Sequence, residues 1–182
     1  MLNPEPLGLY SGDDRVIKYS NDDVVHSQFY FAKEKHMNIS EINIDNVDEI
    51  VEIYIDYYNN HEDCCWTGDT ARKRIHQVLS IEDSYSLLLK DDEGTPIGFV
   101  MGYFKQYDDI IGYTLEEIVI SSDYQHKGIG SNLLKEVEKK VKDRGASCVE
   151  LQAVNDEMHE HYYSKAGYKN ARNFVMKVKW FD

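Results

Sequence analysis

Apolar and polar residues follow two regular patterns along most of this chain, and together the patterns predict a mixed α/β fold. Alternating or continuously apolar stretches, which are typical of strands, cover residues 38–43, 85–90, 96–104, 113–120, 147–154 and 173–180. Helical spacing follows candidate N-caps at Asp45 and at Asp69 or Thr70, and it returns over 131–141 and 156–166. We therefore expect a mostly antiparallel sheet flanked by helices, with one crossover helix, and not a regular βαβ repeat.

The first 36 residues have a sequence pattern that differs from that of the rest of the chain. Pro4, Pro6 and Gly8 mark turns. The stretches 15–19 and 24–31 can pair as a hairpin across the polar residues between them. We expect an N-terminal extension over 1–36 that packs either on a domain formed by 37–182 or on a partner chain.

The composition narrows the classes of function. A length of 182 residues suits one domain with a well-buried core. The formal net charge of -13 argues against nucleic-acid binding, since phosphates would be repelled, and it is compatible with a cationic ligand such as an amine. No apolar run reaches the roughly 18–20 residues that span a bilayer, and the N-terminus does not have the pattern of a secretory signal. We expect a cytoplasmic protein that binds neither nucleic acid nor membrane.

The cysteines and histidines predict neither a disulfide framework nor a metal site. Cys64 and Cys65 cannot easily bridge each other, and the acids and histidine just before them are not followed by a second half with zinc spacing. Cys148 lies in a predicted strand, where we expect a small buried hydrophobe. His159 and His161 are two residues apart, which places them on different faces of a helix, so we expect exposed side chains and no joint site.

The segment from Gln125 to Gly130 joins a predicted buried strand to a predicted helix. Such an arrangement presents free backbone N–H groups at a helix N-terminus, where the helix dipole also favours a phosphate. The dinucleotide fingerprint G-x-G-x-x-G needs a third glycine, but Leu133 stands in that position. A Walker-type phosphate loop does not fit either, because no Gly-Lys-Ser/Thr sequence is present.

Two motifs in this part of the chain resemble the GNAT family of N-acetyltransferases, which use acetyl-coenzyme A (acetyl-CoA). The first is Gln125-His-Lys-Gly128-Ile-Gly130, which matches the signature Gln/Arg-x-x-Gly-x-Gly/Ala. The second is Tyr163-Ser-Lys165-Ala-Gly-Tyr168, which matches Tyr-x-Lys-x-Gly-Phe/Tyr. The resemblance spans about residues 37–182 and implies the GNAT sheet, with acetyl-CoA as co-substrate. The stretch 115–125 is also similar to a strand of the spermidine/spermine acetyltransferases that carries an acidic pair.

The resemblance implies catalytic roles for three residues. Glu116 would be the general base that removes a proton from the acceptor amine, and Glu117 would contact the substrate or a helix. On a regular strand these two side chains point to opposite faces of the sheet. Tyr163 matches the family's tyrosine that donates a proton to the leaving thiolate. The alternatives are edge carboxylates paired with Lys or Arg, and a core aromatic for Tyr163.

The same resemblance implies a CoA-binding site. The loop that would bind the pyrophosphate contains Gln125, His126, Lys127, Gly128, Ile129, Gly130 and Ser131. The backbone of the strand at Ile118, Val119 and Ile120 would pair with the pantetheine arm as an added strand does. Asn155 stands one residue early for an asparagine that the family often places at the start of the next helix, and Lys165 belongs to the second motif.

The expected function is transfer of the acetyl group of acetyl-CoA to a primary amine of a small molecule. No serine or cysteine has the setting of a covalent nucleophile, so we expect direct transfer in a ternary complex. Two alternatives stay open, a non-catalytic acyl-CoA-binding module and a protein acetyltransferase that acts on N-termini or lysines. In this family the acceptor is set by a region that corresponds to residues 58–70, and homodimers are common.

Overall fold

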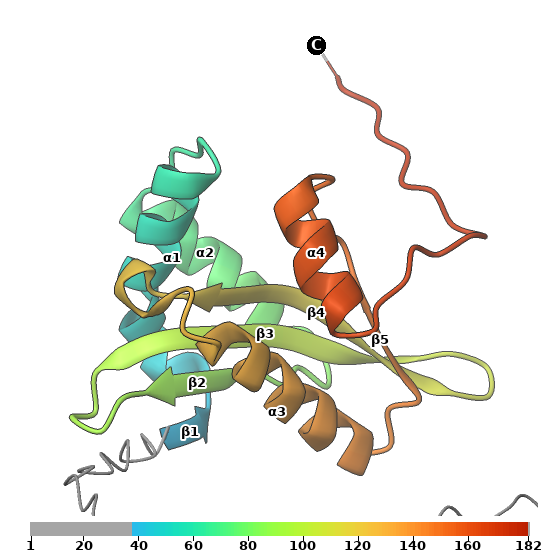
Figure 1. Ribbon diagram of the computed structural model, residues 1–182, viewed down its shortest axis with the longest axis horizontal. Helices are drawn as coiled ribbons and strands as arrows, with labels where there is room; N and C mark the ends of the chain where they lie inside the picture. Colours follow the sequence, from blue (N-terminus) through green and yellow to red (C-terminus); the bar gives the residue numbers. More distant parts are fainter. Residues whose placement is uncertain (1–37, 182) are drawn as a thin grey trace, which may run out of the picture. The chain divides into compact units, whose positions relative to one another are not determined.

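The computed structural model describes residues 38–181, which form one five-stranded sheet with helices on both of its faces (Figure 1). The extension predicted over residues 1–36 lies outside the described part of the chain. The strands are β1 (Asn38–Glu41), β2 (Leu87–Lys90), β3 (Pro96–Gln106), β4 (Ile111–Ile120) and β5 (Cys148–Leu151), in that spatial order. The first four pair antiparallel and β5 pairs parallel with β4, so the predicted mixed, mostly antiparallel sheet is confirmed.

Four α-helices begin close to where the sequence pattern predicts them. They are α1 (Asp48–His61), α2 (Gly68–Leu79), α3 (Ile129–Asp143) and α4 (Glu157–Lys165). The caps of the first two differ from the prediction. Asn43, and not Asp45, caps the short 3-10 helix η1 (Ile44–Asn46) that precedes α1. Thr67 caps α2 in a capping box with Thr70, which is the third residue of that helix. No helix among residues 38–181 has the length and apolar character that crossing a bilayer requires.

The sheet separates two apolar cores. On one face α1 and α2 pack over side chains of the central strands that include Leu88 and Phe99. On the other face α3 packs over a second set that includes Leu87 and Val100. Neighbouring residues of β2 and β3 are therefore buried on opposite faces, as expected for strands covered on both sides. Two packed layers hold β4 in place, and β4 carries the predicted catalytic carboxylates.

A β-bulge interrupts the pairing of β3 with β4 next to these carboxylates. Met101 lies opposite Glu117 and Gly102 lies opposite Leu115, so Glu116 is the extra residue on β4. A bulge locally breaks the alternation of side chains between the two faces of a sheet. The expectation that Glu116 and Glu117 point to opposite faces is therefore wrong, and both carboxylates reach one arginine of α2.

The last part of the sheet also differs from the prediction. Cys148 is exposed and not buried, because β5 is an edge strand in the described part of the chain. Residues 173–181 form no strand, although a strand is predicted over 173–180, and in Figure 1 this segment runs away from the sheet to the C-terminus. An alternating pattern gives a segment the propensity for a strand, but a strand forms only when its backbone groups have a partner.

Candidate active site

The loop between β4 and α3 leads to a helix N-terminus without a side-chain cap. After the short 3-10 helix η2 (Ser122–Tyr124), the chain reaches Gly128, the N-cap of α3, which has φ 77°. Glycine adopts this left-handed conformation without a steric penalty. In this described loop and helix, the first turn of α3 has neither a side-chain cap nor an acidic residue. Its backbone N–H groups and its dipole can therefore receive an anion.

Two side chains of the same loop bind the backbone near them. The side-chain amide of Gln125 donates to the carbonyl oxygen of Ile120 at 2.9 Å. The ammonium group of Lys127 donates to the carbonyl oxygen of Asp123 at 2.6 Å. These bonds tie the loop to the end of β4 and fix the direction in which α3 begins.

A cavity lies along the part of β4 that β5 does not cover. The last pair in the β4–β5 register is Leu115 with Leu151, and beyond it the edge of β4 has no partner strand among the residues described. The cavity has a volume of about 330 Å³. It is lined by Tyr57, Ile118, Ile120, Gln125, His126, Gly128, Gly130, Ser131, Met158, His159, His161, Tyr162, Tyr163 and Lys165. It therefore extends from the N-terminus of α3 to α4.

Tyr163 of α4 lies in the wall of this cavity. Its ring packs against those of Tyr162 and Tyr168, with centroids 5.0 and 5.5 Å away. Burial raises the pKa of Tyr163 to about 12, and the nearby Tyr57 and Glu117 add to the shift. The phenol therefore keeps its proton at neutral pH and can act as a proton donor.

The two carboxylates of β4 form a network with α1 and α2. Glu117 is buried, and its oxygens accept hydrogen bonds from the hydroxyl of Tyr58 and, at 3.1 Å, from Arg74. Burial raises the pKa of Glu117, while Tyr58 and Arg74 oppose that rise. Glu116 pairs with Arg74 at 2.6 Å. Neither carboxylate is among the residues that line the cavity, and the role of Glu116 as the base stays a prediction.

Sequence reasoning missed Arg74, although the chain carries a signal for it. Counting along α2, Arg74 falls on the same face as the buried residues Ala71, Ile75 and Val78. An arginine on the apolar face of a helix needs a partner inside the fold, because a buried charge is costly alone. The acidic pair in the neighbouring strand is that partner.

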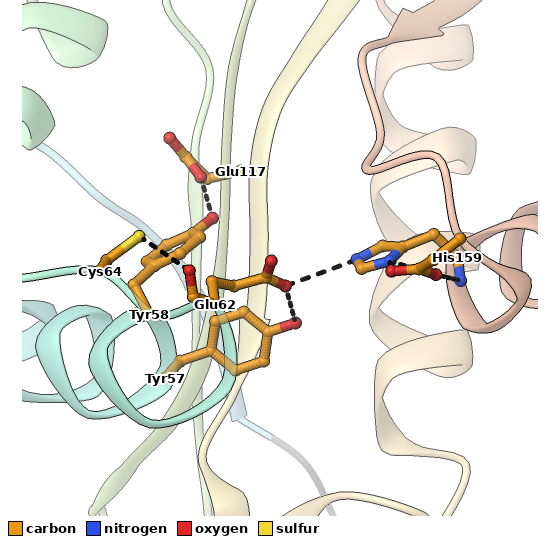
Figure 2. A network of polar contacts seen from close by, with 7 residues as sticks. Tyr57, Tyr58, Glu62, Cys64, Glu117 and His159 are labelled. Atoms are coloured by element: carbon orange, nitrogen blue, oxygen red, sulfur yellow. Dashed lines mark hydrogen bonds and ion pairs between the residues drawn. The ribbon is translucent and has the colours of Figure 1, made fainter.

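A second polar network joins α4 to the end of α1, as Figure 2 shows. The Nδ1 atom of His159 lies 2.9 Å from both carboxylate oxygens of Asp156, which also caps α4 by accepting from the His159 backbone N–H. On the other side of the ring, Nε2 lies 3.9 Å from Oε1 of Glu62. The hydroxyl of Tyr57 donates to that same oxygen at 3.5 Å.

This network changes the interpretation of the two histidines. The side chain of His159 is only 16% exposed, so the expectation of a solvent-exposed group is wrong for it, whereas His161 is exposed. Both line the cavity in spite of their spacing, because the cavity follows more than one face of α4. In the described part of the chain, no group of three or more His, Cys, Asp or Glu side chains is placed to hold a metal ion.

The structure brings most of the predicted site residues to one cavity. Nine of them are in its lining, namely Ile118, Ile120, Gln125, His126, Gly128, Gly130, Ser131, Tyr163 and Lys165. Besides the two carboxylates of β4, four others are not: Val119 is buried in the core under α1 and α2, Lys127 binds its own loop, Ile129 packs against the α3 core, and Asn155 is exposed. The family often has an asparagine at the start of this helix, whereas here the N-cap of α4 is Asp156.

The chemical groups that line the cavity suit those of CoA. The uncapped N-terminus of α3 can hold the pyrophosphate, and the uncovered edge of β4 can pair with the amides of the pantetheine arm. Gly130 leaves the backbone accessible here, since a Cβ at this position would fill the space up to the hydroxyl of Tyr162, 3.4 Å away. Bound acetyl-CoA would supply an activated thioester to the end of the cavity that holds Tyr163.

Comparison with known proteins agrees with this site. Residues 47–168 match the family model described as the acetyltransferase (GNAT) family. An uncharacterized N-acetyltransferase of Archaeoglobus fulgidus is 22% identical over 118 residues, which are 63% of this chain and 80% of that protein. The uncharacterized protein YxbD of Bacillus subtilis is 30% identical over 98 residues, 53% of this chain and 57% of its own length.

A solved structure shows the same fold. It is the aminoglycoside N-acetyltransferase AAC(6')-Iy in complex with CoA, with a TM-score of 0.63 and 16% identity, and the match covers 81% of this chain and 97% of that one. The family match extends over more than half of the chain and contains the α3 loop, both carboxylates of β4 and Tyr163. The chain therefore belongs to the GNAT family and is an acetyl-CoA-dependent N-acetyltransferase.

Proposed function

We propose that this enzyme transfers the acetyl group to a primary amine of a small molecule, by direct attack of the amine on the thioester in a ternary complex. The observation that carries the proposal is the composition of one cavity. It joins the anion-binding N-terminus of α3, the uncovered edge of β4 and the protonated phenol of Tyr163. The three features suit, in that order, the pyrophosphate, the pantetheine arm and the leaving thiolate.

Direct transfer is favoured because the cavity offers no covalent nucleophile. Among its described lining residues there is no cysteine, and the one serine, Ser131, lies in the first turn of α3 where the anion would bind. A covalent acetyl-enzyme needs a nucleophile with an adjacent base at the reacting end of the site. Tyr163 instead serves as the acid that protonates the departing sulfur.

The surroundings of the cavity favour a cationic acceptor. Glu62 and Asp156 flank His159, which lines the cavity, and the chain as a whole carries a net charge of -13. Negative charge beside a site raises the local concentration of ammonium ions and speeds their arrival. An amine with a small or aromatic body would also contact Tyr57, which lines the cavity.

Steady-state kinetics with acetyl-CoA and a panel of amines test the proposal. The panel contains tyramine, spermidine and a peptide with an N-terminal alanine, and release of the CoA thiol and the mass of the product are both recorded. We expect acetylation of a small amine, with intersecting lines in double-reciprocal plots as a ternary complex requires. Parallel lines, or an acetyl group found on the protein by mass spectrometry after acetyl-CoA alone, would contradict direct transfer. Acetylation of the peptide but of neither small amine would contradict the small-molecule acceptor.

A further inference from the structure

We propose that His159, held by Asp156, is the residue that accepts the proton of the acceptor amine. The inference rests on the amine acetylation proposed above and names the base for that reaction. It comes from the geometry of the α4 network, in which one ring nitrogen of the imidazole has a carboxylate partner and the other lies toward Glu62 (Figure 2), and from the place of His159 in the lining of the cavity.

Asp156 fixes both the orientation and the tautomer of the imidazole. It accepts a hydrogen bond from the backbone N–H of His159 at 2.8 Å, which anchors the carboxylate at the start of α4. With Nδ1 at 2.9 Å, the neutral ring is held with its hydrogen on Nδ1, so Nε2 keeps a lone pair that can accept a proton. These hydrogen bonds lower the pKa of Asp156, so the carboxylate stays charged and can stabilise the imidazolium that forms.

His159 and Tyr163 lie on the same side of α4. They are four residues apart in one helix, a spacing that makes side chains neighbours on a helix surface, and both line the cavity. A proton acceptor and a proton donor are therefore presented together to one reacting group. This pairing needs no movement of β4, whose carboxylates are engaged elsewhere.

The groups that face His159 favour an ammonium ion beside it. Asp156 belongs to its own helix, and Glu62 and Tyr57 approach from the end of α1. The 3.9 Å between Nε2 and Oε1 of Glu62 is too long for a direct hydrogen bond, and a third polar atom can contact both. Glu62 would attract the ammonium group while Nε2 takes its proton.

Glu116 is less suited to this task than the sequence resemblance implies. Its carboxylate is held 2.6 Å from Arg74 in a hydrogen-bonded ion pair, so it is already engaged by a side chain of α2. It is not among the described residues that line the cavity. With Glu117, it ties β4 to α2 and so holds the strand against which the thioester would lie.

The protons balance in the proposed step. His159 takes one proton from the ammonium group, and the nitrogen lone pair forms a bond to the thioester carbon. The carbon–sulfur bond breaks, and the sulfur receives the proton of Tyr163. The remaining extra proton on the new amide nitrogen restores the phenol through solvent, and His159 releases its proton to solvent. The net products are the amide, the free thiol and one proton.

The pH profile of kcat/KM for the best amine of the panel tests the assignment in four proteins: wild type, His159→Gln, Glu116→Gln and His76→Gln. His76 is an exposed histidine on α2 and controls for the loss of an imidazole away from the cavity. For wild type we expect a loss of rate at acid pH, since a general base acts only in its unprotonated form. In His159→Gln the rate at neutral pH falls about 10²-fold, and the profile rises only as free amine appears at alkaline pH. His76→Gln keeps the wild-type profile.

Each outcome decides a different claim. An unchanged rate and profile in His159→Gln, or loss of the acid limb in Glu116→Gln alone, would overturn the assignment of His159 and leave amine acetylation intact. A wild type that acetylates no amine but still binds CoA, measured by calorimetry, would overturn the proposed function and the assignment with it. Loss of CoA binding in His159→Gln would mean that this side chain shapes the cofactor site and is not the base.

A second measurement needs no turnover. The ¹⁵N shifts of the His159 ring in the free protein report which nitrogen carries the hydrogen. We expect the Nδ1–H tautomer in wild type and a mixed population in Asp156→Asn, whose kcat falls while its KM for acetyl-CoA stays unchanged. A predominant Nε2–H tautomer in wild type would overturn the role given to Asp156 and, with it, the availability of Nε2.

Discussion

Tyr163 has the two properties that a proton donor to a thiolate needs, a place in the cavity wall and a proton that it keeps. Because burial raises its pKa to about 12, the active, protonated form persists throughout the neutral and mildly alkaline range. We predict that Tyr163→Phe lowers kcat by about 10²-fold, with CoA affinity nearly unchanged. The wild-type kcat should show no decline that Tyr163 causes as pH rises from 7 to about 10, since deprotonation begins to matter only on approaching its pKa.

Stopped-time assays of thiol release over that pH range check both parts of this prediction. Tyr107→Phe is the matched control, because Tyr107 binds Glu150 at the far end of the β3–β4 hairpin. Equal kcat values for Tyr163→Phe and wild type would show that the ring serves only to pack against Tyr162 and Tyr168.

At the residue scale, sequence motifs located the cavity but not its polar partners. The loop glycines and Tyr163 are recognisable because their local spacing matches their family pattern. Arg74 and Glu62 are far from these motifs in the chain, and only the packing of α1 and α2 on the sheet brings them near β4 and α4. His159 was visible four residues before Tyr163, but a helical count alone does not tell which faces of α4 a cavity follows.

Among the elements, the bulged pairing of β3 with β4 determines where the carboxylates point. Gly102 lies at the register shift, and a Cβ added there would be 2.3 Å from the carbonyl oxygen of Thr114 and 2.5 Å from the hydroxyl of Tyr113. That hydroxyl donates to the carbonyl of Tyr85 at 2.7 Å, so neither neighbour can move without breaking the local structure. We predict that Gly102→Ala lowers the free energy of unfolding by about 2 kcal/mol.

Urea unfolding followed by circular dichroism measures this loss. Gly68→Ala makes the same chemical change in the first turn of α2, where the nearest atom to the new Cβ is a flexible arginine end at 3.4 Å. We expect this control to be neutral or slightly stabilising, because alanine favours the helix. A Gly102→Ala protein as stable as the control would mean that the β3–β4 pairing adjusts more easily than its contacts indicate.

The sequence pattern predicted most elements and the directions in which the strands pair, but not the local register of that pairing. The helices α1, α2 and α3 and the strands β2, β3 and β4 bury apolar side chains with the period that their sequences show. The bulge at Glu116 cannot be detected in the apolar pattern of β4, because the extra residue becomes apparent only when β4 is aligned with β3. The strand predicted over 173–180 failed for the opposite reason: its pattern is strong, and nothing described in the fold pairs with it.

The C-terminal segment of the molecule differs from the rest of the chain in both its charge and its exposed apolar surface. Residues 165–181 contain five Lys or Arg and no Asp or Glu, whereas the chain as a whole has 33 acidic and 20 basic residues. The same segment exposes its apolar side chains, with Phe174, Met176 and Trp180 each more than 70% exposed. An exposed apolar patch of this kind favours association. Its positive charge is complementary to the acidic surface of a second copy of this chain.

We predict that the full chain forms a homodimer through this segment and that a chain ending at residue 172 is a monomer. Sedimentation velocity at several protein concentrations measures both states, and circular dichroism checks that the shortened chain is folded. Lys177→Glu with Lys179→Glu keeps the apolar residues and reverses the local charge, so this double variant should weaken the dimer, most strongly at low salt. If the full and shortened chains sediment as the same species at every concentration, the exposed segment does not mediate self-association. Dimerisation that the charge reversal leaves intact would assign the contact to the apolar side chains alone.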